Sequence, residues 1–355
     1  MAAGDSPAQH PETEYATLNW LLPELRQLQR LLRLQTPGLR SKRLGIVADG
    51  ERRYPLEAVF LGGRSPRLPT VVILGGVHGV ERIGAQVVLA YLESLLRRLT
   101  WDEALRQMLD RVRLVFVPVV NPVGVRHQTR SNGNGVDLMR NAPLDAVDPV
   151  RWPLGGQRLS RHLPWYRGRR GAPLEAEARA LCELVESVNS EAPLTLALDI
   201  HSGFGFADRL WFPLAGSRRP VPHLPEYYAL QRLLRRSHPH HNYLFEPQSH
   251  HYLCHGDLWD YLYQRSCAHN RLLLPLTLEM GSWRWVKKNP LQLLAFAGLF
   301  HPVKPHRVQR VLRRHTVLLE WLWHAAAAHQ RWLPSGAQRE RLRRMGRKHW
   351  YAGET

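Results

Sequence analysis

Cysteine is scarce in this sequence of 355 residues, which contains only Cys182, Cys254 and Cys267. An odd number of cysteines without CxxC spacing argues against both a disulfide framework and a paired-cysteine metal site. We therefore expect free thiols and a cytoplasmic location, where thiols stay reduced.

Long hydrophobic runs are missing as well. No apolar stretch reaches the roughly 18 residues that a membrane span requires, so no transmembrane helix is expected. The first residues, MAAGDSPAQHPETEY, lack the basic region and apolar core of a secretory signal peptide. Residues 1–14 are polar and are expected to be disordered.

Acidic residues are outnumbered, since 30 Asp and Glu stand against 49 Lys and Arg and give a formal net charge of +19. Such an excess attracts polyanions and acidic substrates. The run RGRR at residues 167–170 and a basic C-terminal tail over residues 334–355 carry part of it. No nucleic-acid-binding motif accompanies these charges, so nucleic acid is not the expected partner. The sequence does not indicate an oligomeric state.

The chain does contain enough apolar side chains for a large core, 44% of all residues. Apolar runs with strand character alternate with segments of helical periodicity, which is typical of an α/β protein. We predict a single α/β domain over residues 15–333, in which helices flank a twisted, mixed and mostly parallel sheet. The expected strands are 43–47, 56–61, 70–74, 112–119, 194–200, 210–212 and 272–279, and the expected helices are 18–34, 81–98, 174–188, 227–236, 257–265 and 308–333.

The stretch from Thr70 to Gly84, TVVILGGVHGVERIG, places polar residues just after an apolar strand. His78 and Glu81 follow in a tight turn, and their spacing of three residues predicts that both lie on one face of a helical turn. Sheets of α/β proteins bind ligands at the carboxyl ends of their strands. Because an imidazole and a carboxylate are two of the three protein ligands of a catalytic zinc ion, this pair predicts part of a metal site.

Two later strands also end in polar residues. LTLALDIHSG delivers His201 to the end of a buried strand, which makes it the candidate third zinc ligand, with Asp199 as a candidate support for it. LLLPLTLEMGSW places Glu279 at the end of a strand of leucines, where a carboxylate is costly unless it has a partner or a task. A general base for an activated water is such a task, and a buried salt bridge is the alternative.

Residues 121–173 show no long periodicity, and a segment of this kind within a compact domain is usually functional. It contains QTRSNGNGVDLMRN, in which Arg130 and Arg140 flank a turn rich in Gly and Asn. Guanidinium groups bind carboxylates in bidentate fashion and stabilise oxyanions, so these arginines are candidates for an anion clamp. In a chain this rich in arginine, a surface position is the alternative for either one.

Taken in order, HGVE, TRS…GVDLMRN, DIHSG and TLEMG resemble the zinc metallocarboxypeptidases of the carboxypeptidase A type. The resemblance spans roughly residues 17 to 330 and implies the α/β fold of that family. It also implies one zinc ion per chain and hydrolysis of the C-terminal peptide bond of a peptide substrate. The implied zinc ligands are His78, Glu81 and His201.

The same resemblance implies roles for three further residues. Arg130 corresponds to the arginine that polarises the scissile carbonyl, Arg140 to the arginine that binds the terminal carboxylate, and Glu279 to the general base. Met139 departs from the family, which usually has asparagine there, so one hydrogen bond to the carboxylate is missing and recognition of a free C-terminus is open. The family also has a substrate-binding tyrosine on a mobile loop, for which Tyr252 is the candidate, with Tyr261 and Tyr263 in range.

Two other functions stay open from the sequence. HGxE also resembles the aspartoacylase and succinylglutamate desuccinylase deacylases, which remove acyl groups from small amino acids; a panel of C-terminal peptides and N-acyl amino acids would separate the two activities. A polyanion-binding protein with a vestigial metal site is the other alternative. Its binding would weaken steeply with salt, so a salt titration would test it.

Overall fold

The computed structural model describes residues 22–294 and 296–352. The segment expected to be disordered, residues 1–14, lies outside the described residues. The strands are β1 Arg40–Asp49, β2 Arg52–Gly62, β3 Thr70–Gly75, β4 Arg113–Val117, β5 Thr195–Ser202, β6 Arg209–Phe212, β7 Leu244–Pro247 and β8 Leu273–Met280.

Helices of very different length connect and cover these strands. The α-helices are α1 Pro23–Leu32, α2 Arg82–Arg98, α3 Glu103–Leu109, α4 Pro122–His127, α5 Ala176–Asn189, α6 Leu224–Ser237, α7 Leu258–Ala268, α8 Trp283–Lys288, α9 Pro305–Ala327, α10 His329–Trp332 and α11 Gly336–Trp350. Short 3₁₀ helices are η1 Leu138–Arg140, η2 Gln248–His250, η3 Pro290–Leu294 and η4 Phe296–Leu299.

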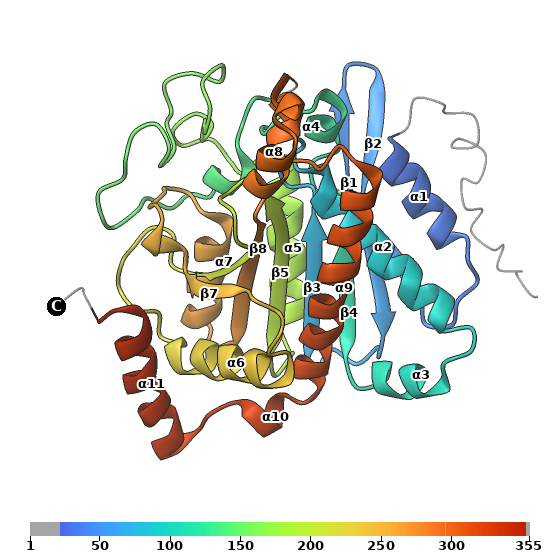
Figure 1. The fold of residues 1–355 in the computed structure, drawn as a ribbon, viewed down its shortest axis with the longest axis vertical. Coiled ribbons are helices and arrows are strands. Elements are labelled where there is room, and N and C mark those ends of the chain that lie inside the picture. The colour runs from blue at the N-terminus through green and yellow to red at the C-terminus, as the bar shows by residue number, and fades with distance from the viewer. Residues whose placement is uncertain (1–21, 295, 353–355) are drawn as a thin grey trace, which may run out of the picture.

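Within the described residues, eight strands form one sheet in the order β1-β2-β4-β3-β5-β8-β6-β7 (Figure 1). Its centre is parallel, because β4, β3, β5 and β8 pair in the same direction. The hairpin of β1 and β2 joins one side in antiparallel pairing, and β6 pairs antiparallel with β8 on the other side. The predicted single α/β domain with a mixed, largely parallel sheet is thereby confirmed.

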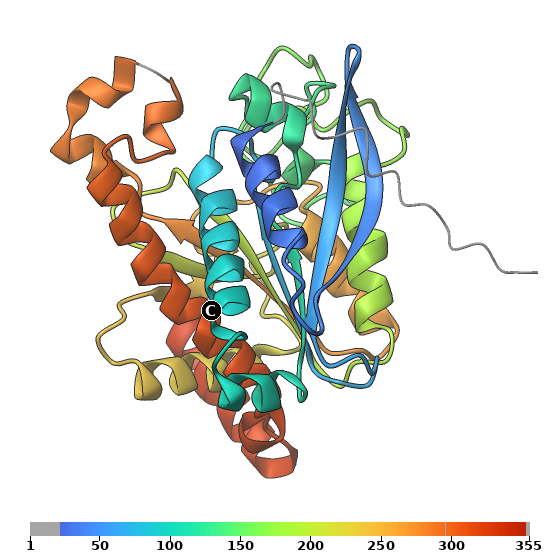
Figure 2. The ribbon, with the colours of Figure 1, turned by 90° about the vertical axis from the view of Figure 1, so that its right-hand side faces the viewer.

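Helices cover both faces of the sheet and make a three-layer structure (Figure 2). On one face lie α1, α2, α6 and α9, and on the other lie α5 and α7. Successive side chains of a strand point to opposite faces, so β3 contributes to both cores. Val71 and Ile73 pack into the first core, and Val72 and Leu74 pack into the second.

Most elements lie where the apolar pattern predicted them, but the short elements β7, α3, α4 and α8 were not predicted. β7 has only four residues, and α3 has seven. Segments of this length carry too few apolar positions to show a period. The expected helix over residues 308–333 is wrong as one continuous element, because α9 ends at Ala327 and α10 follows. There the indole Nε1 of Trp332 donates to the carbonyl of Ala325 at 2.8 Å, which satisfies a free carbonyl of the helix end.

The C-terminal region expected to be a basic tail contains a helix, because residues 336–350 form α11, which packs against α6. Three residues at intervals of four, Leu342, Gly346 and Trp350, form its buried face. Trp350 Nε1 donates to the carbonyl of Phe245 at 2.8 Å. The many basic residues of this helix lie mostly on its exposed side, which is why charge dominated its sequence pattern.

The three cysteines are free thiols, two of them buried and Cys267 half-buried. Among the described residues, no helix is long and apolar enough to cross a membrane. The cytoplasmic location stays a prediction.

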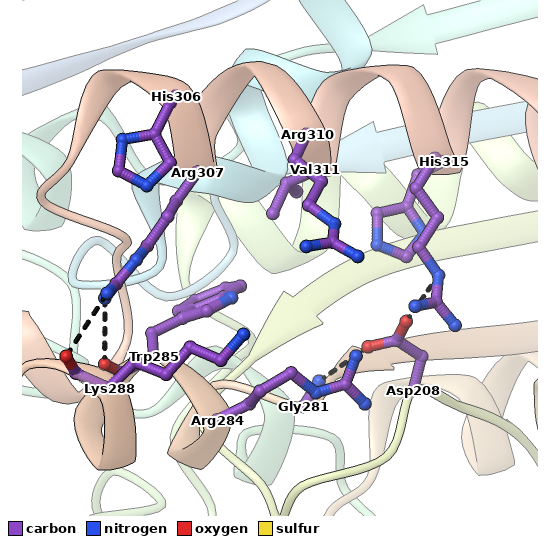
Figure 3. A pocket seen from close by; sticks show the side chains of 11 residues that line it. Asp208, Gly281, Arg284, Trp285, Lys288, His306, Arg307, Arg310, Val311 and His315 are labelled. Atoms are coloured by element: carbon purple, nitrogen blue, oxygen red, sulfur yellow. Dashed lines mark hydrogen bonds and ion pairs between the residues drawn. The ribbon is translucent and has the colours of Figure 1, made fainter.

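Two regions of the structure are taken up below. The carboxyl ends of the neighbouring strands β3, β5 and β8 meet at one edge of the sheet, where loops gather. A separate cavity of about 320 Å³ lies between α8 and α9 (Figure 3).

Candidate active site

The turn after β3 carries the first two predicted site residues. His78 lies within this turn, and Glu81 is the residue that precedes α2, so the pair does not lie on a helical turn as the spacing suggested. The backbone N–H of Glu81 donates to the carbonyl of His78 at 3.1 Å and closes the turn. Gly79 is required between them, because a Cβ there would lie 1.8 Å from the backbone of Gly124. The tight turn therefore points both side chains toward the end of the sheet.

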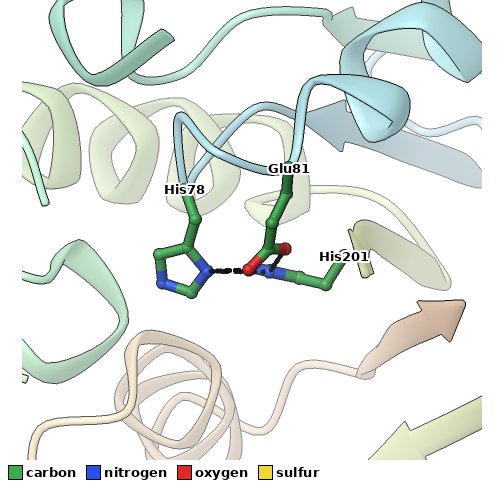
Figure 4. Close-up of side chains that lie close together, drawn as sticks. All are labelled: His78, Glu81 and His201. Atoms are coloured by element: carbon green, nitrogen blue, oxygen red, sulfur yellow. Dashed lines mark hydrogen bonds and ion pairs between the residues drawn. The ribbon is translucent and has the colours of Figure 1, made fainter. Parts of the chain in front are cut away.

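The structure brings His201 to the same point from the end of β5 (Figure 4). His78 Nδ1 lies 2.9 Å from one carboxylate oxygen of Glu81, and His201 Nδ1 lies 2.9 Å from the other. The two imidazole Nδ1 atoms are 3.2 Å apart. All three side chains are buried, with exposed fractions of 2 to 3%. Three residues separated by up to 123 positions in the sequence thus converge on one small volume.

Each imidazole also has a carboxylate on its outer side. His78 Nε2 lies 3.0 Å from Asp137 Oδ1, and His201 Nε2 lies 2.8 Å from Asp199 Oδ2. The indole Nε1 of Trp259 donates to the same oxygen of Asp199 at 3.0 Å. A proton on each Nε2 is favoured by these carboxylates, which leaves the lone pair of each Nδ1 directed toward the centre of the cluster.

This donor set fits a zinc ion. Two imidazole nitrogens and one carboxylate match the three protein ligands of a catalytic zinc site, and their ligand atoms all lie within 4.8 Å of one another. Outer carboxylates on both histidines are the usual support of zinc-binding imidazoles. Among the described residues, this is the one group of three histidine, cysteine or acidic side chains placed closely enough to bind a metal ion.

Positive charges nearby keep the two buried carboxylates of the cluster, Glu81 and Asp137, ionised. Burial by itself raises the pKa of Glu81, but His78 and His201 lower that pKa far below its ordinary value. Burial likewise opposes the charge on Asp137, yet Arg130 and His78 hold its pKa well below the usual range. A carboxylate that stays ionised while buried needs positive charge nearby, which is the environment a divalent cation provides.

Glu279 reaches the same edge of the sheet from β8. In the parallel register of β5 and β8, Glu279 is the direct partner of His201. Its Oε2 atom is buried, and among the described residues it has no hydrogen-bond partner. Burial, followed by repulsion from Glu81, raises the pKa of Glu279 to about 8. The predicted base therefore lies beside the cluster. Glu279 forms no ion pair with the described residues, so the alternative of a buried salt bridge is not supported.

Arg130 contacts the cluster from the long irregular segment that follows α4. Its Nε donates to Asp137 Oδ2 at 2.8 Å, and a terminal nitrogen lies 3.4 Å from Glu81. The side chain is half-buried, with 25% of its surface exposed. The guanidinium is thus fixed beside the ligand set and keeps access to a bound substrate.

Arg140 is buried in the same loop, with an exposed fraction of 2%. One terminal nitrogen donates to the carbonyl of Met139 at 3.1 Å. Its Nε and its second terminal nitrogen are buried and, among the described residues, have no acceptor. The guanidinium carbon lies 5.5 Å from the ring centroid of Tyr252. A buried cation with two unused donors is costly, and this arrangement is suited to an anionic ligand.

The structure also distinguishes the three candidate tyrosines by their surroundings. The ring of Tyr252 lies beneath the guanidinium of Arg140. Tyr261 instead contacts Arg265, and Tyr263 is buried with its hydroxyl bonded to His223. Of the three, Tyr252 is the one beside a predicted site residue.

Asp137 is the residue of the site that sequence reasoning missed. It links three parts of the site, since its carboxylate binds His78, Arg130 and the backbone N–H of Met139. Its signal in the sequence was its place in GVDLMRN, between the two candidate arginines. Met139 itself is buried, so its thioether belongs to the core beside Arg140.

Comparison with known proteins agrees with this geometry. The family model for zinc carboxypeptidases matches residues 46–284. The catalytic chain of human carboxypeptidase N is 28% identical over 185 residues, which cover 48% of this chain and 39% of that protein. Carboxypeptidase SOL1 of Arabidopsis thaliana is 22% identical over 259 residues, 71% of this chain and 48% of that protein. The chain thus matches less than half the length of these relatives.

The fold of this chain is also similar to those of solved structures. Carboxypeptidase A from Helicoverpa armigera superposes with a TM-score of 0.63 at 18% identity and covers 86% of this chain and 71% of that chain. Bovine thrombin-activatable fibrinolysis inhibitor, solved with a tick carboxypeptidase inhibitor, gives a TM-score of 0.60 at 16% identity, with coverages of 86% and 93%.

Proposed function

The chain belongs to the zinc carboxypeptidase family, and on this premise we propose that it is a metallocarboxypeptidase that removes C-terminal residues from peptides. The observation that carries the proposal is the convergence of His78, Glu81 and His201 on one point, with a carboxylate behind each imidazole. These three side chains would hold the zinc ion. When bound, zinc supplies a Lewis acid that lowers the pKa of water toward about 7.

Glu279 performs the proton transfers in this proposal. Its buried and unpartnered Oε2 accepts a proton from the attacking water and then passes it to the amine that leaves. Its position opposite His201 in the sheet supports this role, because the base must stand beside the ligand set. The apolar strand that carries it fixes the carboxylate in place.

Two arginines bind the two negatively charged groups of the substrate, one each. Arg130, held by Asp137 at 2.8 Å, donates to the oxyanion that develops on the scissile carbonyl. Arg140 binds the terminal carboxylate through its Nε and its unused terminal nitrogen, since both donors lack an acceptor among the described residues. Tyr252 covers the same guanidinium and would contact the last residue of the substrate.

Replacement of Glu279 by Gln tests the proposal, because it removes the base and keeps the shape. We expect the variant to retain its zinc and its thermal unfolding midpoint while turnover of N-blocked peptides falls by about 1,000-fold or more. Zinc content by mass spectrometry and turnover on peptides ending in each of the 20 common amino acids are the measurements. Near wild-type turnover by the variant would sink the mechanism.

The deacylase alternative is tested by the same preparation. N-acyl amino acids such as N-acetylaspartate are added to the panel at equal concentration. A metallocarboxypeptidase prefers the peptides, whereas faster hydrolysis of the N-acyl amino acids would assign the site to deacylation. The buried position of Arg140 beside Tyr252 favours a substrate carboxylate with an apolar group next to it. Peptides and N-acyl amino acids both have such a carboxylate, so the relative rates of hydrolysis distinguish the two functions.

A further inference from the structure

The cavity between α8 and α9 is set apart from the candidate active site by its lining (Figure 3). None of its lining residues belongs to the donor set, the base or the two arginines described above. Its walls come from Asp208 just before β6, from Gly281 just after β8, from α8 and from the first three turns of α9. The lining residues are Asp208, Gly281, Arg284, Trp285, Lys288, His306, Arg307, Arg310, Val311, Arg314 and His315.

The charge of this cavity is strongly positive. Five permanently charged cations face the single carboxylate of Asp208, which leaves a net charge of +4 before the histidines are counted. Arg314 forms the one ion pair with that carboxylate, at 2.9 Å. Burial lowers the pKa of His315 to about 4; Asp208 opposes this shift and Arg314 adds to it, so this imidazole is neutral at pH 7. The remaining cations lack a counter-charge within the cavity.

The cations without a counter-charge fall into two groups, those that donate to backbone carbonyls and those that have no partner. Arg307 donates to the backbone carbonyls of Trp285 and Lys288, at 3.0 and 3.3 Å, and Arg284 donates to the carbonyl of Phe206. Such bonds orient a guanidinium without neutralising its charge. Figure 3 shows the side chains of Lys288 and Arg310 directed from facing helices into the space between them. Neither has an ion-pair or hydrogen-bond partner for its charged group among residues 22–294 and 296–352.

The position of these cations on α9 is also unusual. Helix N-termini carry partial positive charge and favour acidic side chains. The first turn of α9 contains no acidic residue, and His306, Arg307 and Arg310 follow its start at Pro305 within two turns. The helix therefore adds its own positive end to a set of like charges. A bound polyanion removes this repulsion.

The shape favours a small ligand over an extended chain. The cavity holds about 320 Å³, at the lower end of small-molecule sites, and Trp285 and Val311 form an apolar wall in it. A nucleic acid would follow a long basic stripe instead. We propose that this cavity is a second ligand site, which binds a compact anion carrying two or more phosphate groups. Arginine forks match phosphate oxygens, and a charge of −3 to −4 balances the lining.

Two exposed residues allow a test that leaves the fold and the active site intact. The Lys288→Gln/Arg310→Gln double variant removes two cations that point into the cavity. The Lys287→Gln/Arg313→Gln variant is its matched control, because those residues are exposed on the same helices, do not line the cavity and carry the same charge. Sodium tripolyphosphate is titrated into each full-length protein by calorimetry in phosphate-free buffer at low salt.

We expect wild type and the control to bind one tripolyphosphate with affinities within about twofold of each other, and the Lys288→Gln/Arg310→Gln variant to bind at least tenfold more weakly. Removal of active-site zinc by the polyphosphate would appear equally in both double variants, so it cannot produce this difference. Absence of binding to wild type, or equal weakening in the two double variants, overturns the proposal.

Further arms identify the source of the phosphates. Adenosine triphosphate and vesicles that contain an inositol bisphosphate lipid present the same chemistry as a soluble nucleotide and as a membrane headgroup. In each case the proposal requires that Lys288→Gln/Arg310→Gln weaken binding more than the control. A single-stranded oligonucleotide that binds more tightly than all three and is indifferent to these substitutions would instead assign the positive charge to a nucleic-acid surface.

Discussion

The two halves of the candidate active site differ in how their charges are paired. In the metal half, His78, Glu81 and His201 contact one another, and a carboxylate stands behind each imidazole. In the anchor half, Arg140 is equally buried but has two donors without an acceptor among the described residues. The first half is assembled by the protein alone, whereas the second is completed only by a ligand.

Because of this difference, substitutions in the two halves should affect stability and function differently. A substitution in the metal half removes contacts that the folded chain already makes, so it costs both. A substitution of Arg140 in the anchor half removes a buried charge that the folded chain leaves partly unsatisfied, so it costs function alone. The predictions below test this separation, from the largest expected effect to the smallest.

Among the substitutions that compare the two halves, Arg140→Met gives the largest effect. It removes the guanidinium but keeps an apolar side chain of similar length, so we expect kcat/KM for peptides to fall by about 100-fold or more, mainly through KM. The thermal unfolding midpoint should stay the same or rise, because no unused buried donor remains. Steady-state kinetics and calorimetry of the variant measure the two quantities. A large loss of stability together with the loss of activity would break the distinction between the halves.

Asp199→Asn weakens the metal half. The substitution keeps the shape and the contact with Trp259 but removes the charge behind His201. Zinc affinity should fall by about 10- to 100-fold, which competition with a chromogenic chelator measures. At saturating zinc, activity should largely return. Unchanged zinc affinity would show that Asp199 has no part in holding the imidazole.

Met139→Asn adds an amide donor next to Arg140 and tests whether residue 139 lies within reach of the substrate carboxylate. We expect KM for peptides with a free C-terminus to fall by about 3- to 10-fold, since a charge-assisted hydrogen bond contributes about 1 kcal/mol or more. Stability should drop by about 1–2 kcal/mol, because Met139 is buried in the core and asparagine is polar. The matched control is the same peptide with an amidated C-terminus, and an equal gain there would refute a contact with the carboxylate.

Glu320→Gln is the smallest effect and serves as a reference outside the site. Glu320 on α9 accepts from Tyr91 at 2.5 Å and from Arg98 at 3.1 Å. Burial opposes its charge, but bonds from His324, Tyr91 and Arg98 lower the pKa of Glu320 to about 2. Its contribution to stability is present above the unfolded-state pKa of roughly 4.5 and is lost as the pH falls toward 2.

Denaturation of this variant should therefore show a loss of about 1–2 kcal/mol at pH 7, after allowance for the partial exposure of the pair. The difference from wild type should shrink between pH 5 and pH 3. Activity per folded molecule should not change. A difference that is independent of pH would mean that packing, and not charge, makes the contribution.

Much of the fold was predictable because apolar residues repeat with a clear period. The buried strands that end near His78, His201 and Glu279 are continuous apolar runs, and a polar residue at the end of each was visible without coordinates. Parallel pairing then brings these ends together. Tertiary contacts were the limit, since the role of Asp137 depends on a loop that folds back 59 residues after His78.

The missed elements have a common physical cause. α11 buries Leu342, Gly346 and Trp350 against the body of the protein, and one of these has no side chain. A helix with so few apolar positions depends on its partner helix, so its own sequence reads as a basic tail. The cavity between α8 and α9 was not predicted for a related reason, because its cations are divided between two helices that contact each other only in the folded chain.

The central claim, that His78, Glu81 and His201 form a zinc site, is tested most directly by metal analysis of protein purified without chelators. The structure predicts close to one zinc per chain in the wild type and loss of that zinc in His201→Ala, with the Arg140→Met variant retaining it. A wild-type protein that hydrolyses peptides while free of metal, or a His201→Ala variant that keeps a full equivalent of zinc, would contradict the account.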